Sequence, residues 1–195
     1  MSIEDPLLID LPAQIVTERL SIVPPAPGDG PMLNRAIAES FAELHEWMPW
    51  AARLPSVDES ERFVREAAAN YVRRSDLPLF LRDRNTREFI GASGLHRIDW
   101  SVPRMEIGYW CRTSRVGRGY VTEAVLAIAR LAFDVLRAER VEIRTDTANT
   151  RSWRIAERLG FTLEGVLRHD TRTPQGEIRD TRVYAMTDRA ALRTP

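Results

Sequence analysis

Two glycines that flank an arginine, directly before a helical pattern, are the residues here whose spacing most clearly suggests chemistry. Gly117, Arg118 and Gly119 follow a strand-like run and precede a long apolar helix pattern. Glycine lets the backbone approach a ligand closely because it has no Cβ. The first amides of a helix lack carbonyl partners, and the helix dipole is positive there. The sequence therefore predicts a phosphate-binding turn over residues 117–122, although a plain tight turn has the same glycine spacing.

The turn matches neither of two common nucleotide-binding motifs. A dinucleotide-binding fingerprint would place a third glycine where Thr122 stands. A P-loop would have lysine and then serine or threonine after its last glycine, and this turn does not. The sequence therefore indicates a phosphate ligand that is held mainly by backbone amides.

Cys111, the single cysteine of the chain, is a second candidate for chemistry, because a thiolate can attack a thioester. A thiol with an ordinary pKa of about 8.5 would need an adjacent base or cation to act in this way. A free cysteine is more often a small buried hydrophobic residue. We therefore expect no covalent intermediate on Cys111.

The composition excludes several classes of function. A length of 195 residues with 44% hydrophobic content suits a single domain over residues 1–195. The 28 basic and 28 acidic residues leave no net field to hold nucleic acid or a membrane, so neither partner is expected. One cysteine and three scattered histidines predict no metal site. The start, "MSIEDPLLID", is acidic where a secretory signal would be basic, which predicts a cytoplasmic protein.

Apolar spacing predicts the elements in the first half of the chain. Pro49 ends the first predicted helix, and Ser56 with Glu59 has the spacing of a capping box that starts the second. Three β-rich runs follow, joined by short polar links, and predict an antiparallel meander. The predicted ranges are strand 20–23, helix 32–47, helix 56–72 and strands 77–83, 88–98 and 104–111.

The second half alternates between helix and strand patterns. From Gly119 the apolar period becomes three to four residues, which predicts a helix that packs on the sheet. That stripe consists of Val121, Val125, Ile128, Ala132 and Val135. Asn149 caps a further helix that Gly160 ends. The other predicted elements are strand 141–145 and strands 161–167 and 181–186, which flank a hairpin loop at 173–177. The total is a mixed sheet with helices on its faces.

Several of these segments together resemble a known superfamily. "RVGRGYVTEA", followed by a helix, a strand and "NTRSWRIAERLGF", resembles the GNAT superfamily of acyl-CoA-dependent N-acetyltransferases. "ERLSI", "LHEWMPW", "GLHRIDW", "EIGYW" and "LEGVLR" resemble its RimJ/RimL branch, whose members acetylate the N-termini of ribosomal proteins. The resemblance covers residues 17–186. It implies an α/β (α+β) GNAT fold, with a twisted, mostly antiparallel mixed sheet that is splayed at its centre and has helices on both faces.

The resemblance also implies a coenzyme site for acetyl-CoA as cosubstrate. In the family pattern Gln/Arg-x-x-Gly-x-Gly/Ala, turn amides hold the diphosphate, and Val116 and Val121 depart from it here. Arg118 would add a charged contact to phosphate. The strand before the turn would line the pantetheine arm, with Trp110 against the acyl group. The implied coenzyme-binding residues are Tyr109, Trp110, Cys111, Gly117, Arg118, Gly119, Tyr120, Val121, Thr122, Asn149 and Ser152.

The leaving thiolate needs a hydrogen-bond donor. Many GNAT enzymes have a tyrosine seven residues after the asparagine, and Ala156 occupies that place here. The Rim branch has Asn-x-x-Ser instead, which Asn149 and Ser152 match, so the resemblance implies Ser152 as the donor to sulfur. His169 and Asp170 would face the acceptor. Thr171 stands where Rim-type members can carry a glutamate.

The acceptor amine must lose a proton before it attacks. An α-amino group with a pKa of about 8 is neutral far more often at pH 7 than a lysine at about 10.4, so an N-terminus is the easier nucleophile. Glu106, on the strand before the turn, is the predicted general base. The sequence thus predicts acetyl transfer to a protein or peptide N-terminus in a ternary complex. A small amine, such as an antibiotic, amino acid or polyamine, and a non-catalytic acyl-CoA-binding module are the alternatives. A homodimer is expected by analogy with the family.

Overall fold

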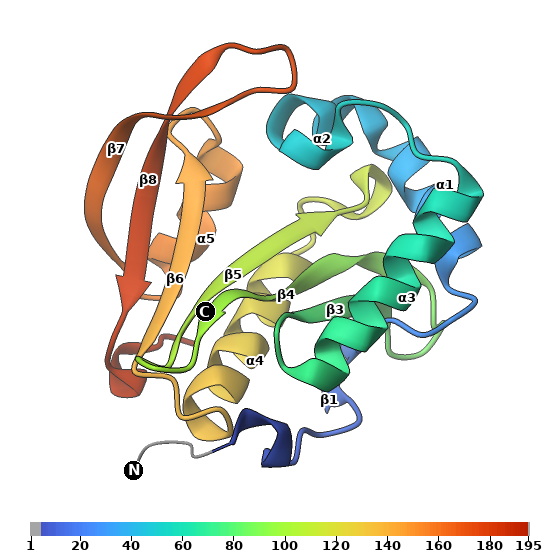
Figure 1. Cartoon of the computed structure of the whole chain (residues 1–195). Coiled ribbons are helices and arrows are strands. Elements are labelled where there is room, and N and C mark those ends of the chain that lie inside the picture. Colours follow the sequence, from blue (N-terminus) through green and yellow to red (C-terminus); the bar gives the residue numbers. More distant parts are fainter. Residues whose placement is uncertain (1–4, 195) are drawn as a thin grey trace.

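The computed structural model describes residues 5–194, so the first four residues of the acidic start lie outside it. Eight strands form one sheet in the order β1-β2-β3-β4-β5-β6-β8-β7 (Figure 1). The strands are β1 (Ile15–Val16), β2 (Leu20–Val23), β3 (Leu77–Asp83), β4 (Phe89–Asp99), β5 (Arg104–Cys111), β6 (Arg140–Asp146), β7 (Thr162–Arg172) and β8 (Ile178–Met186). The α-helices are α1 (Gly30–Glu39), α2 (Phe41–Trp47), α3 (Val57–Arg73), α4 (Tyr120–Asp134) and α5 (Thr150–Arg158).

All neighbouring strands are antiparallel except β5 and β6, which are parallel and are joined through α4. Their pairing begins at Arg104 with Arg140 and ends at Glu106 with Glu142, after which the two strands separate. We call this point the fork. Beyond it β5 and β6 diverge toward α2 (Figure 1). The predicted antiparallel meander of β3, β4 and β5 and the central splay are therefore confirmed.

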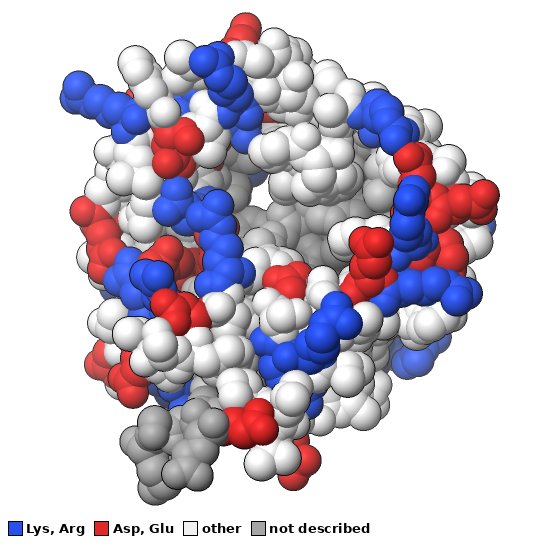
Figure 2. All heavy atoms as spheres, viewed as in Figure 1, with Lys and Arg blue, Asp and Glu red and all other residues white. Residues whose placement is uncertain are grey.

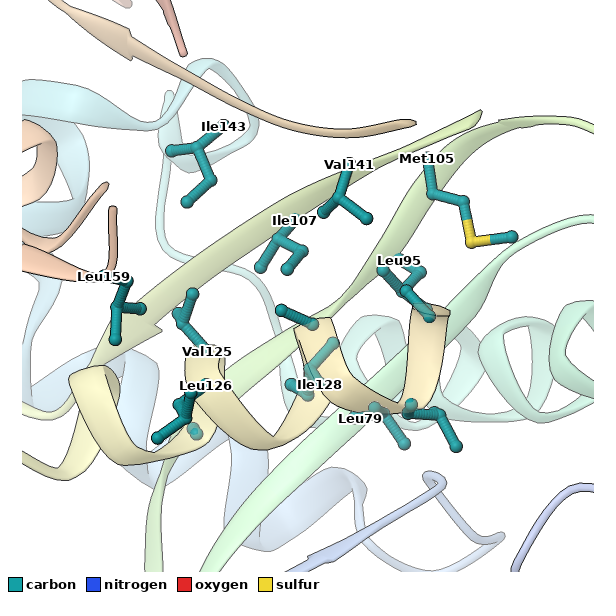
Figure 3. Close-up of a cluster of buried hydrophobic side chains, with 14 of the residues drawn as sticks. Leu79, Leu95, Met105, Ile107, Val125, Leu126, Ile128, Val141, Ile143 and Leu159 are labelled. Carbon is teal, nitrogen blue, oxygen red and sulfur yellow. The ribbon is translucent and has the colours of Figure 1, made fainter. Parts of the chain in front are cut away.

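One apolar layer lies between the sheet and α4. Val125 and Ile128 of the predicted stripe are fully buried and meet Ile107 of β5 and Val141 of β6 (Figure 3). The helix ends at Asp134, one residue before the predicted stripe does, and Val135 is its C-cap. Because α4 packs across the strands on both sides of the fork, this layer holds the two halves of the sheet together while the fork stays open.

A second apolar cluster covers the opposite face of the sheet. It joins Leu33 of α1 and Val64 of α3 to Phe80 and Phe89 of the strands, with Trp110 packed against it. The α3 helix starts with the predicted capping box, in which Ser56 and Glu59 exchange side-chain to backbone hydrogen bonds. The sheet therefore has helices on both faces, as predicted.

The predicted helix over residues 32–47 is instead two helices. The chain bends at Ser40, which is buried and whose hydroxyl accepts a hydrogen bond from the Thr113 amide. The apolar spacing continues through the bend, so the sequence pattern alone does not reveal it. The bend turns α2 toward the open side of the fork (Figure 1).

The C-terminal hairpin is longer than predicted. β7 continues past residue 167 to Arg172, and β8 begins at Ile178 instead of residue 181. The register shifts between Leu167 and Thr171, and His169 has a positive φ of 53° there. β7 is an edge strand with mostly exposed side chains, so it lacks the apolar alternation that marks a half-buried strand. The short β1 was missed because two residues give no pattern. Across residues 5–194, no helix has both the length and the apolar character to cross a membrane.

Candidate active site

The turn before α4 has the backbone that phosphate binding requires. Gly117 and Gly119 have φ values of 77° and 80°, in the left-handed region that favours glycine. The first hydrogen bond of α4 runs from the Glu123 amide to the Gly119 carbonyl. Within residues 5–194, none of the six amides of residues 117–122 donates a hydrogen bond to the protein. These amides and the positive helix end therefore form a cradle for an anion.

An arginine far away in sequence supports this cradle. Arg19, before β2, donates from Nη1 to the Arg118 carbonyl at 2.7 Å and from Nε to the Glu123 carboxylate at 2.7 Å. Its guanidinium carbon also lies 4.7 Å from the centre of the Tyr120 ring. The family places a glutamine or arginine where Val116 stands, and Arg19 supports the loop from the other side instead. Nothing in the spacing of residues 117–122 indicates this contact.

A groove of about 600 Å³ leads from the cradle along β5 and the start of α5. Ten of the predicted coenzyme residues line it, and Arg118 does not. Those ten are Tyr109, Trp110, Cys111, Gly117, Gly119, Tyr120, Val121, Thr122, Asn149 and Ser152. The sequence reasoning missed Arg151, Arg154 and Arg158, which line the groove from one helix. Their spacing of three and four residues would have indicated a basic face for further phosphate groups.

Side chains of β5 alternate between the two faces of the sheet. Tyr109 and Cys111 pack against the cluster under α4, whereas Trp110 packs against the cluster under α1 and α3. The Trp110 ring lies 5.7 Å from Phe89 and 6.3 Å from Trp50, centre to centre. Trp110 thus lines the groove and packs on the core at the same time.

Two hydroxyl groups meet on the α5 side of the fork. Ser152 Oγ donates to the Tyr109 hydroxyl at 3.2 Å, and Tyr109 donates to the Ser152 carbonyl at 3.0 Å. Burial raises the pKa of Tyr109 to about 12, against the hydrogen bond from Ser152, which lowers it. The phenol therefore keeps its proton at neutral pH. Ala156, which stands where many family members have a tyrosine, is buried. Tyr109 of β5 instead brings a phenol next to Ser152.

Asn149 combines a capping role with a place in the groove. Its Oδ1 accepts from the Ser152 amide at 3.1 Å, as expected for an N-cap. It also lines the groove beside Ser152. Because the cap uses the oxygen, the Nδ2 atom is left for a ligand.

Cys111 lies in an environment that suppresses thiolate formation. Burial raises the pKa of its thiol to about 11, and Arg112 and Arg115 lower it only in part. A thiol with this pKa is almost fully protonated at pH 7. This agrees with the expectation that Cys111 forms no covalent intermediate.

Glu106 is the last β5 residue that pairs with β6. Its side chain is 20% exposed, and Oε2 is buried with no hydrogen-bond partner within residues 5–194. Arg97 and Arg144 approach that oxygen to 3.6 and 4.0 Å. Burial raises the pKa of Glu106 and outweighs the two arginines, which lower it. The result is a carboxylate at the fork with one oxygen that makes no hydrogen bond within residues 5–194, although Glu106 does not line the groove itself.

A second cavity, of about 630 Å³, lies between α2 and the β7–β8 hairpin. Figure 2 shows this face of the molecule hollowed between the two halves of the sheet, with acidic and basic side chains around the hollow. The cavity shares Glu46, Trp47 and Ala148 with the groove that leads from the cradle, so the two adjoin. Its other ionisable residues are His45, Asp146, His169, Glu177, Arg179 and Asp180.

The structure separates the two predicted acceptor residues. His169 lines the second cavity, and its amide donates to Asp180 Oδ1 at 2.8 Å. Asp170 does not line the cavity, but it pairs with Arg144 at 2.9 Å and so connects β7 to Glu106. Within residues 5–194, no group of three or more His, Cys, Asp and Glu side chains is arranged to hold a metal ion.

Comparison with known proteins identifies the family of the chain. A family model for the acetyltransferase (GNAT) domain matches residues 19–162. The chain belongs to the GNAT acetyltransferase family. A protein of Bacillus licheniformis, uncharacterized N-acetyltransferase p20, is 32% identical to this chain. The match covers 54% of this chain and 59% of the length of that protein. The ribosomal-protein-serine acetyltransferase of Escherichia coli is 28% identical over 63% of this chain and 69% of its own length, which supports the RimJ/RimL-like branch.

A solved structure within the family contains the expected cosubstrate. Microcin C7 self immunity acetyltransferase MccE, in complex with acetyl-CoA and AMP, superposes with a TM-score of 0.85 at 25% identity, over 91% of this chain and 98% of that one. The chain therefore shares the fold of an acetyltransferase that was solved with acetyl-CoA. The amide cradle, the groove and the α5 arginines fit a coenzyme with a diphosphate and a further phosphate.

Proposed function

We propose that this protein acetylates the α-amino group of a protein or peptide N-terminus by direct attack in a ternary complex. The observation on which this rests is the Glu106 carboxylate at the fork, whose buried Oε2 makes no hydrogen bond within residues 5–194. The ribosomal-protein-serine acetyltransferase among the relatives supports an N-terminal acceptor. An α-amine also needs less help from a base than lysine does, because its pKa is lower by about two units.

Each proposed role follows from the position of the residue. The amides of residues 117–122 hold the coenzyme diphosphate, with Arg118 beside them. Residues 109–111 line the pantetheine arm. Glu106 accepts the proton of the acceptor amine through a bridging water, since it is partly exposed but does not line the groove. On the opposite face, the Ser152 hydroxyl turns from Tyr109 to donate a hydrogen bond to the leaving thiolate, and Tyr109 holds Ser152 in place through its carbonyl.

The second cavity is the proposed acceptor site. Four carboxylates line it, from Glu46, Asp146, Glu177 and Asp180, against one guanidinium from Arg179. An ammonium group is attracted to such a cavity, whereas a phosphate is repelled. The lining therefore supports a cationic amine as the acceptor, with His169 in contact and Asp170 acting through Arg144.

A small cationic amine is the second candidate. The volume of about 630 Å³ lies within the range of small-molecule sites, about 300–1,000 Å³. The acidic lining argues against a nucleotide acceptor, although the related MccE structure contains AMP. Cytoplasmic location is part of the proposal, because acetyl-CoA is available there. Homodimerisation stays a prediction that size-exclusion chromatography with light scattering can test.

An acceptor panel tests the proposal. The purified protein is incubated with acetyl-CoA and three sets of acceptors: peptides with a free N-terminus, the same peptides with a blocked N-terminus and an internal lysine, and small amines. Mass spectrometry locates the acetyl group, and release of free thiol gives the rate. We expect acetylation of the free N-termini and not of the blocked peptides. Acetylation of the small amines alone would support the second candidate, and thiol release from none would indicate a non-catalytic binder.

A further inference from the structure

A histidine and an aspartate without a role so far lie beside Glu106. His96 on β4 is directly opposite Glu106 on β5 in the antiparallel register, so the two side chains share a face of the sheet. Asp76 precedes β3, and its Oδ1 lies 2.8 Å from His96 Nδ1. Three separate segments therefore meet on the α3 side of the fork.

Two glycines make room for the imidazole ring. Gly94 and Gly108 form the next pair on the same face, two residues along each strand. A Cβ atom on Gly94 would lie 3.0 Å from Cε1 of His96, and one on Gly108 would lie 3.3 Å from Nε2. The ring thus covers this glycine pair, with Nε2 near Gly108. Because Gly108 lies just beyond the last pair of β5 and β6, Nε2 is at the opening of the fork.

The aspartate selects the tautomer of the ring. A carboxylate accepts a hydrogen bond, so Asp76 favours a proton on Nδ1 and leaves the lone pair of Nε2 free. A carboxylate in this position also stabilises the imidazolium that forms when Nε2 takes up a proton. About a third of the His96 side chain is exposed, at 36%, against 20% for Glu106. The imidazole therefore has the better access to solvent.

The electrostatic coupling of the two residues supports an exchange of protons. A positive charge on His96 lowers the pKa of Glu106, as do Arg97 and Arg144, whereas burial and Glu142 raise it. The ionisable groups around the pair are Asp76, Arg97, Arg144 and Glu142. His96 is more exposed than Glu106, so the neighbouring imidazole offers the Glu106 proton a route to bulk solvent.

We propose that His96, oriented by Asp76, is a proton relay that takes the proton of the acceptor amine from Glu106 and releases it to solvent. This rests on the proposed function. The amine nitrogen forms a bond to the acetyl carbonyl carbon, and the carbon–sulfur bond breaks with its electron pair on sulfur. The proton lost by nitrogen passes to the Glu106 carboxylate, then through a bridging water to Nε2 of His96, then to solvent. His96 acts through Glu106 and contacts no substrate.

The test uses His96→Ala with the acceptor that the wild-type protein acetylates best. We expect kcat to fall about 100-fold, the lower end of the range for positioned proton transfer, with little change in KM or in the thermal midpoint. Because the glycine pair leaves a space under the missing ring, added imidazole should restore part of the rate and saturate. Asp76→Asn should lower kcat by less than His96→Ala does. Asp99→Asn is the matched control, because it makes the same substitution on the same side of β4, and it should leave kcat unchanged.

A second measurement does not depend on acetyl transfer. The carboxyl ¹³C signal of Glu106 is followed against pH in the wild type and in His96→Ala. We expect the Glu106 pKa to rise in the variant, because the charge on His96 that lowers it is gone. An unchanged Glu106 titration, or a folded His96→Ala protein with normal kcat or no response to imidazole, would overturn the relay. If the wild type acetylates no amine, the proposed function fails, and the titration still decides whether His96 and Glu106 are coupled.

Discussion

The proposed coenzyme cradle at residues 117–122 offers backbone amides to a ligand, whereas the fork offers side chains from distant segments. In the cradle, Val116 and Val121 differ from the family pattern and yet the six free amides are present. At the fork, Ala156 of α5 stands in place of the family tyrosine, and Tyr109 of β5 brings a phenol to Ser152. Backbone sites thus depend on local conformation and tolerate side-chain changes, while side-chain sites can be rebuilt from other elements.

Gly119→Asp should have the largest effect, because it changes a residue of the amide cradle itself. An aspartate would need a left-handed backbone, would meet Arg19 Nη2 and would bring a negative charge to the phosphates. We expect acetyl-CoA affinity to fall more than about 1,000-fold, about 4 kcal/mol, by calorimetry. Gly176→Asp, also at a positive φ but in the β7–β8 hairpin, is the control and should leave the affinity unchanged. Equal acetyl-CoA affinities in the two variants would contradict coenzyme binding at residues 117–122.

Glu106→Gln should separate catalysis from coenzyme binding. We expect kcat to fall by about 10²–10⁴-fold with no change in acetyl-CoA affinity, since the variant loses only the proton acceptor. Glu142→Gln is the matched control, because Glu142 pairs with Glu106 across the fork but is held by Arg140. A normal kcat in Glu106→Gln would end the general-base assignment.

The pH dependence of the wild type sharpens the same point. Burial raises the pKa of Glu106 from its ordinary 4.5, so the carboxyl stays protonated to a higher pH. The base form is therefore lost on acidification already above pH 4.5, and kcat/KM should fall there. That acidic limb should be absent in Glu106→Gln. Its persistence would assign it to another group.

Ser152→Ala removes one hydroxyl from the α5 side of the fork. A hydrogen bond to a developing thiolate contributes about 2 kcal/mol, so we expect kcat to fall about 30-fold while acceptor KM is unchanged. Because Ser152 and Tyr109 are hydrogen bonded to each other, Tyr109→Phe should give a similar loss, and the double variant little more. Fully additive losses would contradict a shared role.

Arg19→Ala tests support of the cradle from outside it. The variant loses the contacts to the Arg118 carbonyl and to Glu123, so the turn becomes less rigid. We expect acetyl-CoA affinity to fall about tenfold, about 1.4 kcal/mol, with an unchanged kcat at saturation. Arg19→Lys keeps the charge but not the planar guanidinium with its several donors, so its acetyl-CoA affinity should fall nearly as much. Wild-type affinity in Arg19→Ala would show that the glycines hold the turn alone.

Cys111→Ala should have the smallest effect. With its pKa raised to about 11, the thiol is protonated below that pH and cannot act as a nucleophile near neutrality. We expect kcat within about twofold of the wild type, measured by thiol release. Complete inactivity of a folded Cys111→Ala protein would revive a covalent route.

Features that depend on neighbouring residues could be predicted from the sequence. The glycine pair of the cradle, the capping box of Ser56 and Glu59 and the Asn149 cap each need only a few adjacent residues. The bend at Ser40 could not be predicted, because a contact with Thr113 causes it. The extent of β7 was also missed, because exposed residues on both faces leave no alternation to read.

The sequence by itself determined the glycine turn before α4 and the apolar stripe of α4, because each depends on residues that are close together along the chain. Only the tertiary structure decided which side chains meet at the fork. Asp76, His96 and Glu106 come from three segments, and Tyr109 meets Ser152 from 43 residues away. Strand register and the separation of β5 from β6 bring these groups together, and neither is encoded in any single stretch of sequence.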